Sequence, residues 1–245
     1  MPGFLTDARE ILVPRAGSAH GPLPPLLLSM TLVTGLVDAF SYLMLGHVFV
    51  ANMTGNVVFL GFALAGAPGF SAAASLTALA AFGLGALAGG WLAARHSGDR
   101  GRLHSSAATA QAGCLAAGLV LAVAAGQQPG TGYRYPLIVA LGLAMGLQNA
   151  AARKIAVPDL TTTVLTLTIT GIAADSTLVG GPGSKAARRL LSVLTMFAGA
   201  LAGAALALHV RAWIPLALAF AAIAVGAMIT RTLGSSDPSW VHAPA

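Results

Sequence analysis

Charged residues are scarce in this chain, and that scarcity excludes a soluble domain. Only 8% of its 245 residues are charged and 56% are hydrophobic, and the mean hydropathy is +0.81. Soluble domains carry about 25% charged residues. Apolar runs of about 18 or more residues, the length that crosses a bilayer, recur along the sequence. The composition therefore predicts an all-α integral membrane protein whose main partner is the lipid bilayer.

Cysteine and glutamate are also nearly absent. Cys114 is the one cysteine, so an internal disulfide and a cysteine metal cluster are excluded. Glu10 is the one glutamate, and the six histidines show no ligand spacing. We therefore expect no enzyme, no metal and no cofactor. The 13 basic residues lie mainly between apolar runs rather than in a patch with aromatic residues, which argues against nucleic-acid binding and for positive loops on the cytoplasmic side.

Eight apolar segments form two similar sets of four. The first set covers residues 24–44, 54–65, 70–94 and 107–125, and the second covers residues 136–151, 160–179, 189–210 and 213–229. Short motifs recur between the sets in the same order: Gly35-Leu36-Val37-Asp38-Ala39 with Gly146-Leu147-Gln148-Asn149-Ala150, Val50 to Asn56 with Val157 to Thr163, Gly66-Ala67-Pro68-Gly69 with Gly180-Gly181-Pro182-Gly183, and Gly85-Ala86-Leu87-Ala88-Gly89 with Gly199-Ala200-Leu201-Ala202-Gly203. We infer an internal duplication.

Segment 54–65 would span only about 18 Å as a helix, which is too short to cross. If it and segment 160–179 each enter and return to one side, eleven of the 13 basic residues share a side, and only Arg134 and Arg211 lie opposite. This positive-inside bias favours six crossings plus two re-entrant segments, and three crossings per repeat make the repeats inverted. Eight crossings are the alternative, because segment 160–179 is long enough to span.

The expected organisation is then a cytoplasmic tail (residues 1–22), membrane repeats (residues 23–128 and 129–232) and a C-terminal tail (residues 233–245). Within each repeat, polar residues interrupt the apolar sequence, and we expect residues 48–56 and 156–163 to be non-helical. Irregular backbone at membrane depth must be buried or line a wet cavity. Helix starts beside such breaks form the usual binding sites of secondary transporters, although these residues would also serve as plain helix caps.

Acids and amides near these interruptions are the candidate site, because a carboxylate inside a bilayer is costly and by default functional. Asp38, Asn52, Asn149 and Asp159 are expected to converge near the membrane midplane. For Asp38 the alternative is a neutral acid bonded within the bundle, and for Gln148 a plain interhelical bond. The candidate substrate-binding residues are Asp38, Asn52, Thr54, Asn56, Gln148, Asn149, Asp159, Thr161 and Thr162.

At these motifs the sequence resembles the YoaK family of bacterial multi-spanning membrane proteins, a domain of unknown function. The resemblance covers about residues 25–230 and includes Asn52-Met53-Thr54-Gly55-Asn56 and Pro158-Asp159-Leu160-Thr161-Thr162-Thr163. It implies a multi-pass protein of the bacterial inner membrane, whose N-terminus the loop charges make cytoplasmic. It implies no substrate or activity.

The leading hypothesis is a secondary transporter or permease for a small polar solute, with proton coupling through Asp38 or Asp159 as one option. No nucleotide-binding loop is present, so ATP does not drive it directly. A non-transporting assembly or regulatory subunit is the alternative, and a membrane-embedded enzyme acting on lipids is less favoured. The oligomeric state is left open, with a homo-oligomer among the options.

Overall fold

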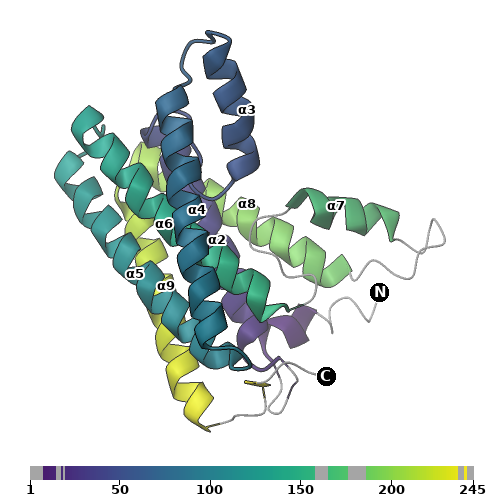
Figure 1. The fold of residues 1–245 in the computed structure, drawn as a ribbon. Coiled ribbons are helices and arrows are strands. Elements are labelled where there is room, and N and C mark those ends of the chain that lie inside the picture. The colour runs from purple at the N-terminus through teal and green to yellow at the C-terminus, as the bar shows by residue number, and fades with distance from the viewer. Residues whose placement is uncertain are drawn as a thin grey trace.

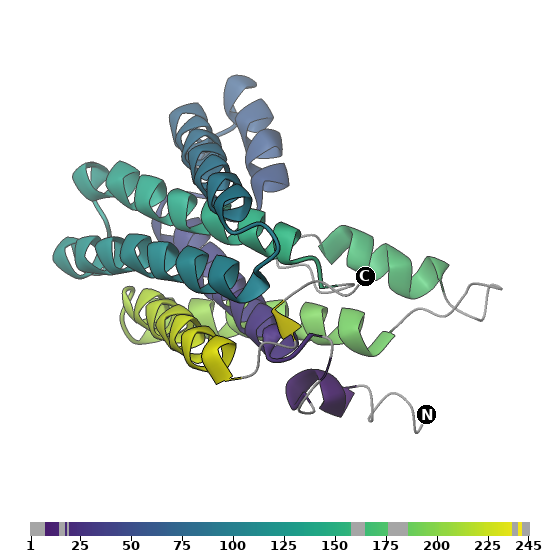
Figure 2. The ribbon, with the colours of Figure 1, turned by 60° about the horizontal axis from the view of Figure 1, so that its bottom comes forward.

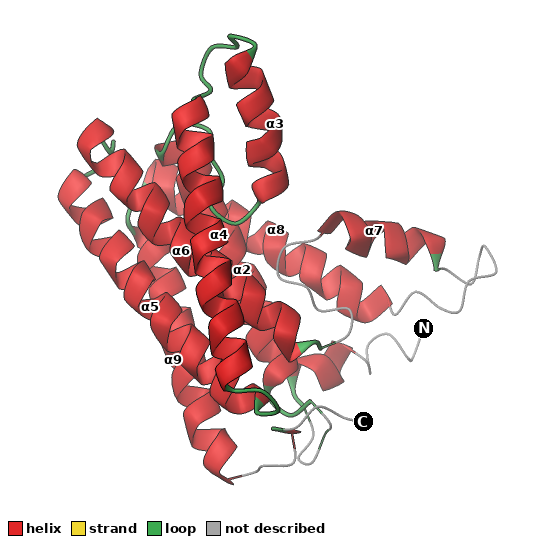
Figure 3. Cartoon of the chain, in the orientation of Figure 1, coloured by secondary structure: helices red, strands yellow, loops and turns green. Residues whose placement is uncertain are grey.

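A computed structural model of the chain describes residues 8–14, 18, 20–157, 165–175, 186–236 and 240–241. After a short helical stretch at residues 8–12, the helices are α2 (Leu23–Met44), α3 (Met53–Leu64), α4 (Ala72–Arg95), α5 (Arg100–Ala125), α6 (Thr131–Ile155), α7 (Leu165–Ala174), α8 (Ala186–His209) and α9 (Ile214–Ser236). Figure 1 shows the long helices side by side as one bundle, and the described residues contain no strand (Figure 3).

Six of the described helices are long and apolar enough to cross a membrane, namely α2, α4, α5, α6, α8 and α9, and α3 is a shorter apolar helix. The all-α membrane fold is therefore confirmed. The span in α2 is 72% buried and that in α6 is 61% buried, whereas the other four spans are 22–33% buried. Thus α2 and α6 form the centre of the bundle, and the remaining helices present apolar faces outward.

Side-chain caps and turn glycines explain several helix ends. The carboxylate of Asp99 accepts a hydrogen bond from Arg102 N at 2.7 Å and starts α5, seven residues earlier than expected. Helix α6 also starts earlier than expected, so that Pro136 lies inside the helix rather than in its first turn. The bond that Pro136 cannot make would go to the carbonyl of Gly132. That carbonyl lies in the exposed first turn, so the missing bond leaves no buried group unpaired.

Helix α3 belongs to an excursion that leaves and rejoins the same end of the bundle. His47, just after α2, bonds through Nδ1 to the carbonyl oxygen of Gly69, just before α4, at 3.0 Å. Between these points the chain turns back into the bundle. Asp38 lies six residues before the end of α2, about 9 Å along the helix, and Ala51 reaches this depth to bond to it. Helix α3 then returns to the end where α4 begins (Figure 1).

The predicted non-helical stretch 48–56 is therefore wrong in its second half. Residues 45–52 are non-helical, but α3 begins at Met53. Gly55 permits the Phe49 ring to pack against this first turn of α3, because a β-carbon there would lie 2.7 Å from the ring. In the second stretch, Ala156 and Val157 are non-helical, as expected. Residues 158–163 lie outside the described part.

Glycine pairs bring α2 against α8. A β-carbon on Gly35 would meet the backbone of Met196 at 2.5 Å, and one on Gly203 would meet the carbonyl oxygen of Leu36 at 2.9 Å. Gly199 lies equally close to the Leu32 backbone. These backbones approach closely only because glycine has no side chain, as small-residue pairs do in membranes generally. The pairing makes α2 and α8 parallel.

The same pairing joins α4 to α6. Gly85 faces the Leu143 backbone, a β-carbon on Gly89 would meet the carbonyl oxygen of Leu147 at 2.9 Å, and Gly146 faces the backbone of Phe82. Each of these contacts lies between residues that correspond, in the recurring motifs, to those of the α2–α8 pair. The two halves therefore exchange matching contacts. Because α4 runs against α2 and parallel to α6, α2 and α6 run in opposite directions (Figure 2).

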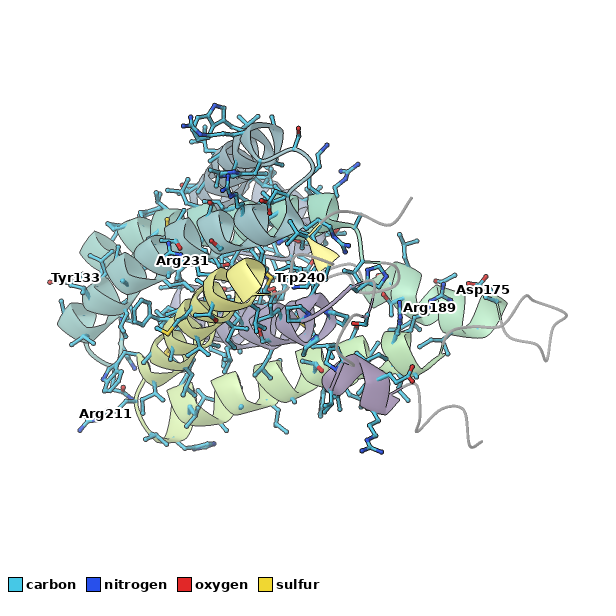
Figure 4. All side chains as sticks on the ribbon, turned by 90° about the horizontal axis from the view of Figure 1, so that it is seen from below. Tyr133, Asp175, Arg189, Arg211, Arg231 and Trp240 are labelled. Carbon is cyan, nitrogen blue, oxygen red and sulfur yellow. The ribbon has the colours of Figure 1, made fainter. Side chains whose placement is uncertain are left out.

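Charged residues separate between the two ends of the bundle. Figure 4 places Asp175 and Arg189 at the end opposite Tyr133 and Arg211. The end with Asp175 also carries most of the other basic residues of the described part: Arg95, Arg100, Arg102, Arg153, Lys154 and Arg188. We call this the basic end, and the end with Arg134 and Arg211 the far end.

Candidate functional site

Asp38 fixes the inward turn between α2 and α3. Its Oδ1 accepts hydrogen bonds from the backbone N–H groups of Val50 at 3.1 Å and Ala51 at 2.9 Å. The side chain is only 4% exposed. Its Oδ2 is buried and has no hydrogen-bond partner within the described residues. One oxygen of this carboxyl group therefore holds the turn, and the backbone N–H group of Asn52 also stabilises the carboxylate.

Asn56 holds the turn from the α3 side. Its Oδ1 accepts a bond from Phe49 N at 3.0 Å, and its Nδ2 donates to Phe49 O at 2.6 Å. The side chain is fully buried, and it is the buried residue of α3. Since both ends of the amide bind the backbone of Phe49, Asn56 positions the turn.

Asn52 and Thr54 have exposed side chains at the start of α3. Asn52 occupies the N-cap position but makes no side-chain capping bond, so the first-turn N–H groups of α3 lack the partner that a cap supplies. Both residues line a cavity of about 490 Å³. Its wall also includes Ala51, Phe59, Phe82, Thr166 and Met196, from the turn 45–52, α3, α4, α7 and α8. Polar groups thus face a largely apolar cavity directly beside the turn that Asp38 binds.

An aromatic cluster around α3 was not expected from the sequence. It comprises Tyr42, His47, Phe49, Phe59, Phe62 and Phe70. Tyr42 stacks on Phe49 with ring centroids 5.0 Å apart, and Phe59 lies 5.2 Å from Phe70. These contacts join the end of α2 to α3 and to the turn before α4. The available signal was the concentration of four of the nine phenylalanines within residues 49–70.

Gln148 lies in the bundle core rather than at the turn. Its Nε2 donates to Thr34 Oγ1 at 2.9 Å and to the Met30 carbonyl at 3.2 Å. Its Oε1 accepts a bond from Gln111 Nε2 at 2.7 Å. The structure thus shows the interhelical bond that was one of the two options for Gln148. Gln111 was missed, although a fully buried amide within an apolar run is itself a signal.

The described residues do not bring the two halves of the predicted site together. Asp38 bonds to its own turn, and Asn149 Nδ2 bonds to the Met145 carbonyl one turn earlier in α6. Each of the two lies more than one turn beyond the middle of its helix, toward its C-terminal end. Because α2 and α6 are antiparallel, Asp38 and Asn149 lie toward opposite ends of the bundle.

Three of the predicted site residues, Asp159, Thr161 and Thr162, lie outside the described residues. Asp175, the third acid near an apolar segment, pairs with Arg189 Nη1 at 2.6 Å. The described part contains no group of three or more His, Cys, Asp or Glu side chains able to hold a metal ion. The site that the structure defines is therefore centred on Asp38, the turn 45–52 and the start of α3.

Six apolar crossing helices and a short helix beside a buried carboxyl group define a multi-pass membrane protein. A family described as "Protein of unknown function (DUF1275)" matches residues 26–230, and the chain belongs to this family. It is 34% identical over 155 residues to the "UPF0700 transmembrane protein YoaK" of Bacillus subtilis (strain 168), a match that covers 61% of this chain and 65% of that relative. No solved structure matches the chain. The resemblance to the YoaK family is thus confirmed.

Proposed function

We propose that this protein is a secondary permease for a small polar solute, bound in the cavity lined by Asn52 and Thr54. The observation that carries the proposal is the carboxyl group of Asp38, whose Oδ2 is buried without a partner in the described part. A buried polar atom without a partner costs several kcal/mol in an apolar medium. A site that binds a proton, a cation or a polar solute would offset that cost.

The arrangement of the turn supports this role. Backbone N–H groups of Val50 and Ala51 satisfy one oxygen of Asp38, and the start of α3 offers further N–H groups and a partial positive charge. A broken segment with a helix start at membrane depth is the recurring binding geometry of secondary transporters. A carboxyl group held in this way would take up and release a proton, which is the basis for the proposed proton coupling.

We further propose that the two halves are inverted repeats and that the site has a second half around Asp159, Thr161 and Thr162. The matching glycine contacts of the α2–α8 and α4–α6 pairs support the duplication. Two halves with the same contact pattern would move against each other as rigid bodies. Each polar turn would then line a solute path from one end of the bundle. Asn149 then corresponds to Asp38, and Asn52 to Asp159.

We place the protein in the bacterial cell membrane with its N-terminus and basic end in the cytoplasm. The warrant is the positive-inside rule. Transport is favoured over catalysis, because the site offers one carboxyl group and amides rather than a cluster of acid, base and nucleophile. The buried Oδ2 of Asp38, which has no hydrogen-bond partner within the described residues, favours transport over a non-transporting subunit.

The test is a solute screen on the purified full chain in liposomes at two pH values, read as charge movement or uptake. We expect one class of small polar solute to produce flux. Asp38→Asn should abolish it while the protein stays folded and inserted. Ser29→Ala is the matched control on the same helix, since the Ser29 hydroxyl group donates to the Leu26 carbonyl one turn before it and makes no other side-chain bond within the described residues. Flux that survives Asp38→Asn unchanged would remove the proposal.

A further inference from the structure

A second cavity lies at the far end of the bundle, where α2 ends and α6 begins. Its volume is about 540 Å³. The wall includes Met44, Gly46, Gln127, Gln128, Arg134 and Ala207. Leu45 and Gly46 of the turn 45–52 line it, but it shares no wall residue with the cavity beside α3.

Among the described residues, Arg134 is the one charged residue in the wall of this cavity. Its Nη2 donates to the carbonyl oxygen of Gly46 at 3.2 Å. The guanidinium group packs directly on Gly46, whose φ of +82° and lack of a side chain permit the contact. Nε of Arg134 is buried and has no hydrogen-bond partner within the described residues. A guanidinium group has five N–H donors, so the bond to Gly46 leaves most of its capacity unused.

The charge at this end favours an anion. Arg134 and Arg211 both lie here, and the acids of the described part lie elsewhere. Glu10 precedes α2, Asp99 starts α5 and Asp175 follows α7, all at the basic end. Asp38 binds the turn 45–52. The C-terminal ends of α2, α5 and α8 each contribute about half a negative charge, and the N-terminal ends of α6 and α9 each contribute about half a positive charge. The full charges of Arg134 and Arg211 leave this end of the bundle with a net positive charge. The cavity is therefore electropositive.

The other polar wall residues are donors suited to an oxyanion. Gln127 uses its Oε1 to accept a bond from Ala212 N at 2.7 Å, which leaves its amide N–H₂ group as the remaining polar group. Gln128 is exposed and lines the same cavity. A planar guanidinium fork beside amide donors matches the oxygen atoms of carboxylate and phosphate groups.

We propose that this far-end cavity binds an oxyanion, namely the phosphate or carboxylate group of a small organic solute or of an anionic lipid. The volume exceeds that of inorganic phosphate alone, so the remainder of such a molecule fits beside its charged group. The inference does not rest on the proposed transport activity, because the far-end cavity and the cavity beside α3 share no wall residue.

The test uses the full chain in detergent, with inorganic phosphate titrated against sodium chloride at constant ionic strength. A ligand that binds the native state raises the unfolding temperature saturably. We expect Arg134→Gln to need about tenfold more phosphate for the same shift, as loss of one charge-assisted anchor implies. Arg211→Gln removes the same charge from an exposed neighbouring site and should change the requirement by less than about threefold.

Native mass spectrometry supplies the lipid arm, with phosphatidylglycerol compared with an uncharged glycolipid. Retention of phosphatidylglycerol that is lost in Arg134→Gln identifies a lipid headgroup, whereas a phosphate-dependent temperature shift identifies a free solute. If Arg134→Gln does not fold, Gln128→Glu places a carboxylate in the wall and should cause the same loss. Binding of neither probe, or equal binding by the wild type and these variants, overturns the proposal.

Discussion

The carboxyl oxygen Oδ1 of Asp38 lies 2.9 Å from the backbone nitrogen of Ala51. This bond joins the C-terminal half of a crossing helix to a chain segment that has already left that helix. It therefore sets how deeply the turn 45–52 enters the bundle. The other oxygen of this carboxyl group, Oδ2, is buried and has no hydrogen-bond partner within the described part.

Removing the Asp38 side chain should loosen the turn. Asp38→Ala loses two hydrogen bonds to backbone N–H groups and leaves both donors buried, which we expect to cost about 2–4 kcal/mol of unfolding free energy. Asp38→Asn retains an acceptor oxygen and should cost less than half as much. Thermal unfolding of both variants in detergent measures the difference. Equal loss in the two variants would show that the bonds to Val50 and Ala51 do not hold the turn.

Asn56 should matter to stability more than its neighbour on the exposed side of α3. Asn56→Ala leaves the N–H and carbonyl groups of Phe49 unpaired, which we expect to cost about 2–4 kcal/mol. Val57→Ala is the control, because Val57 is 59% exposed and packs on little of the protein. Thermal unfolding compares the two, and labelling of Asn52→Cys in each background reports opening of the turn. A larger effect of Val57→Ala would contradict this account.

The glycine contacts predict matched behaviour in the two halves. Gly85→Ala and Gly199→Ala each place a methyl group against a facing backbone, at Leu143 and Leu32 respectively. We expect each to destabilise the protein by about 1–3 kcal/mol. Gly83→Ala is the control, since nothing lies within 4 Å of a β-carbon there and alanine favours helix. Thermal unfolding of the three variants measures these effects. Unchanged stability in both Gly85→Ala and Gly199→Ala would contradict the close backbone approach.

His20 should make the basic end sensitive to acid. Burial, and then the positive charges of Arg100 and Arg188, lower the pKa of His20 below its ordinary value of 6.5. The unfolded chain therefore takes up a proton first as the pH falls, so the contribution of His20 is intact above about pH 6.5 and is lost below it. We expect His20→Gln to flatten the fall of the unfolding temperature between pH 7 and pH 5. An unchanged slope would exclude His20 as its source.

Sidedness follows from the six-crossing arrangement. In a Cys114→Ala background, cysteines placed at residues 100 and 187 should be labelled from the cytoplasmic side by an impermeant reagent only after the cells are opened. A cysteine at residue 211 should be labelled in intact cells. Labelling of residues 100 and 187 from opposite sides would instead favour eight crossings.

The sequence predicted the crossing helices well because bilayer thickness imposes one length on each apolar run. Segment 24–44 corresponds to Leu23–Met44, and segment 70–94 to Ala72–Arg95. The start of α5 was missed by seven residues, because Asp99 caps a helix whose first turn carries Arg100 and Arg102. A hydropathy pattern does not detect a polar first turn of a helix, although an acidic capping residue such as Asp99 does mark it.

Side-chain partners were harder to predict than helices. Asp38, Asn52 and Asn56 do gather at one turn, since the motif places them within a short chain segment. To predict whether Asp38 and Asn149 share a site, one must know where their side chains point and how far along the antiparallel helices each residue lies. Sequence spacing alone gives neither. The bond between Gln111 and Gln148 joins α5 to α6, and no local pattern encodes a contact across that separation.

The pairing of α2 with α8 also constrains how the chain is made. The ribosome delivers α2 first, yet the helix that covers its Gly35 face comes from the last third of the chain. Until α8 emerges, α2 must wait beside the insertion machinery or in lipid with Thr34 and Asp38 only partly enclosed. Helix α6 has no such delay, because its partner α4 is already in place. Biogenesis of the two halves is therefore unequal even though their contacts match.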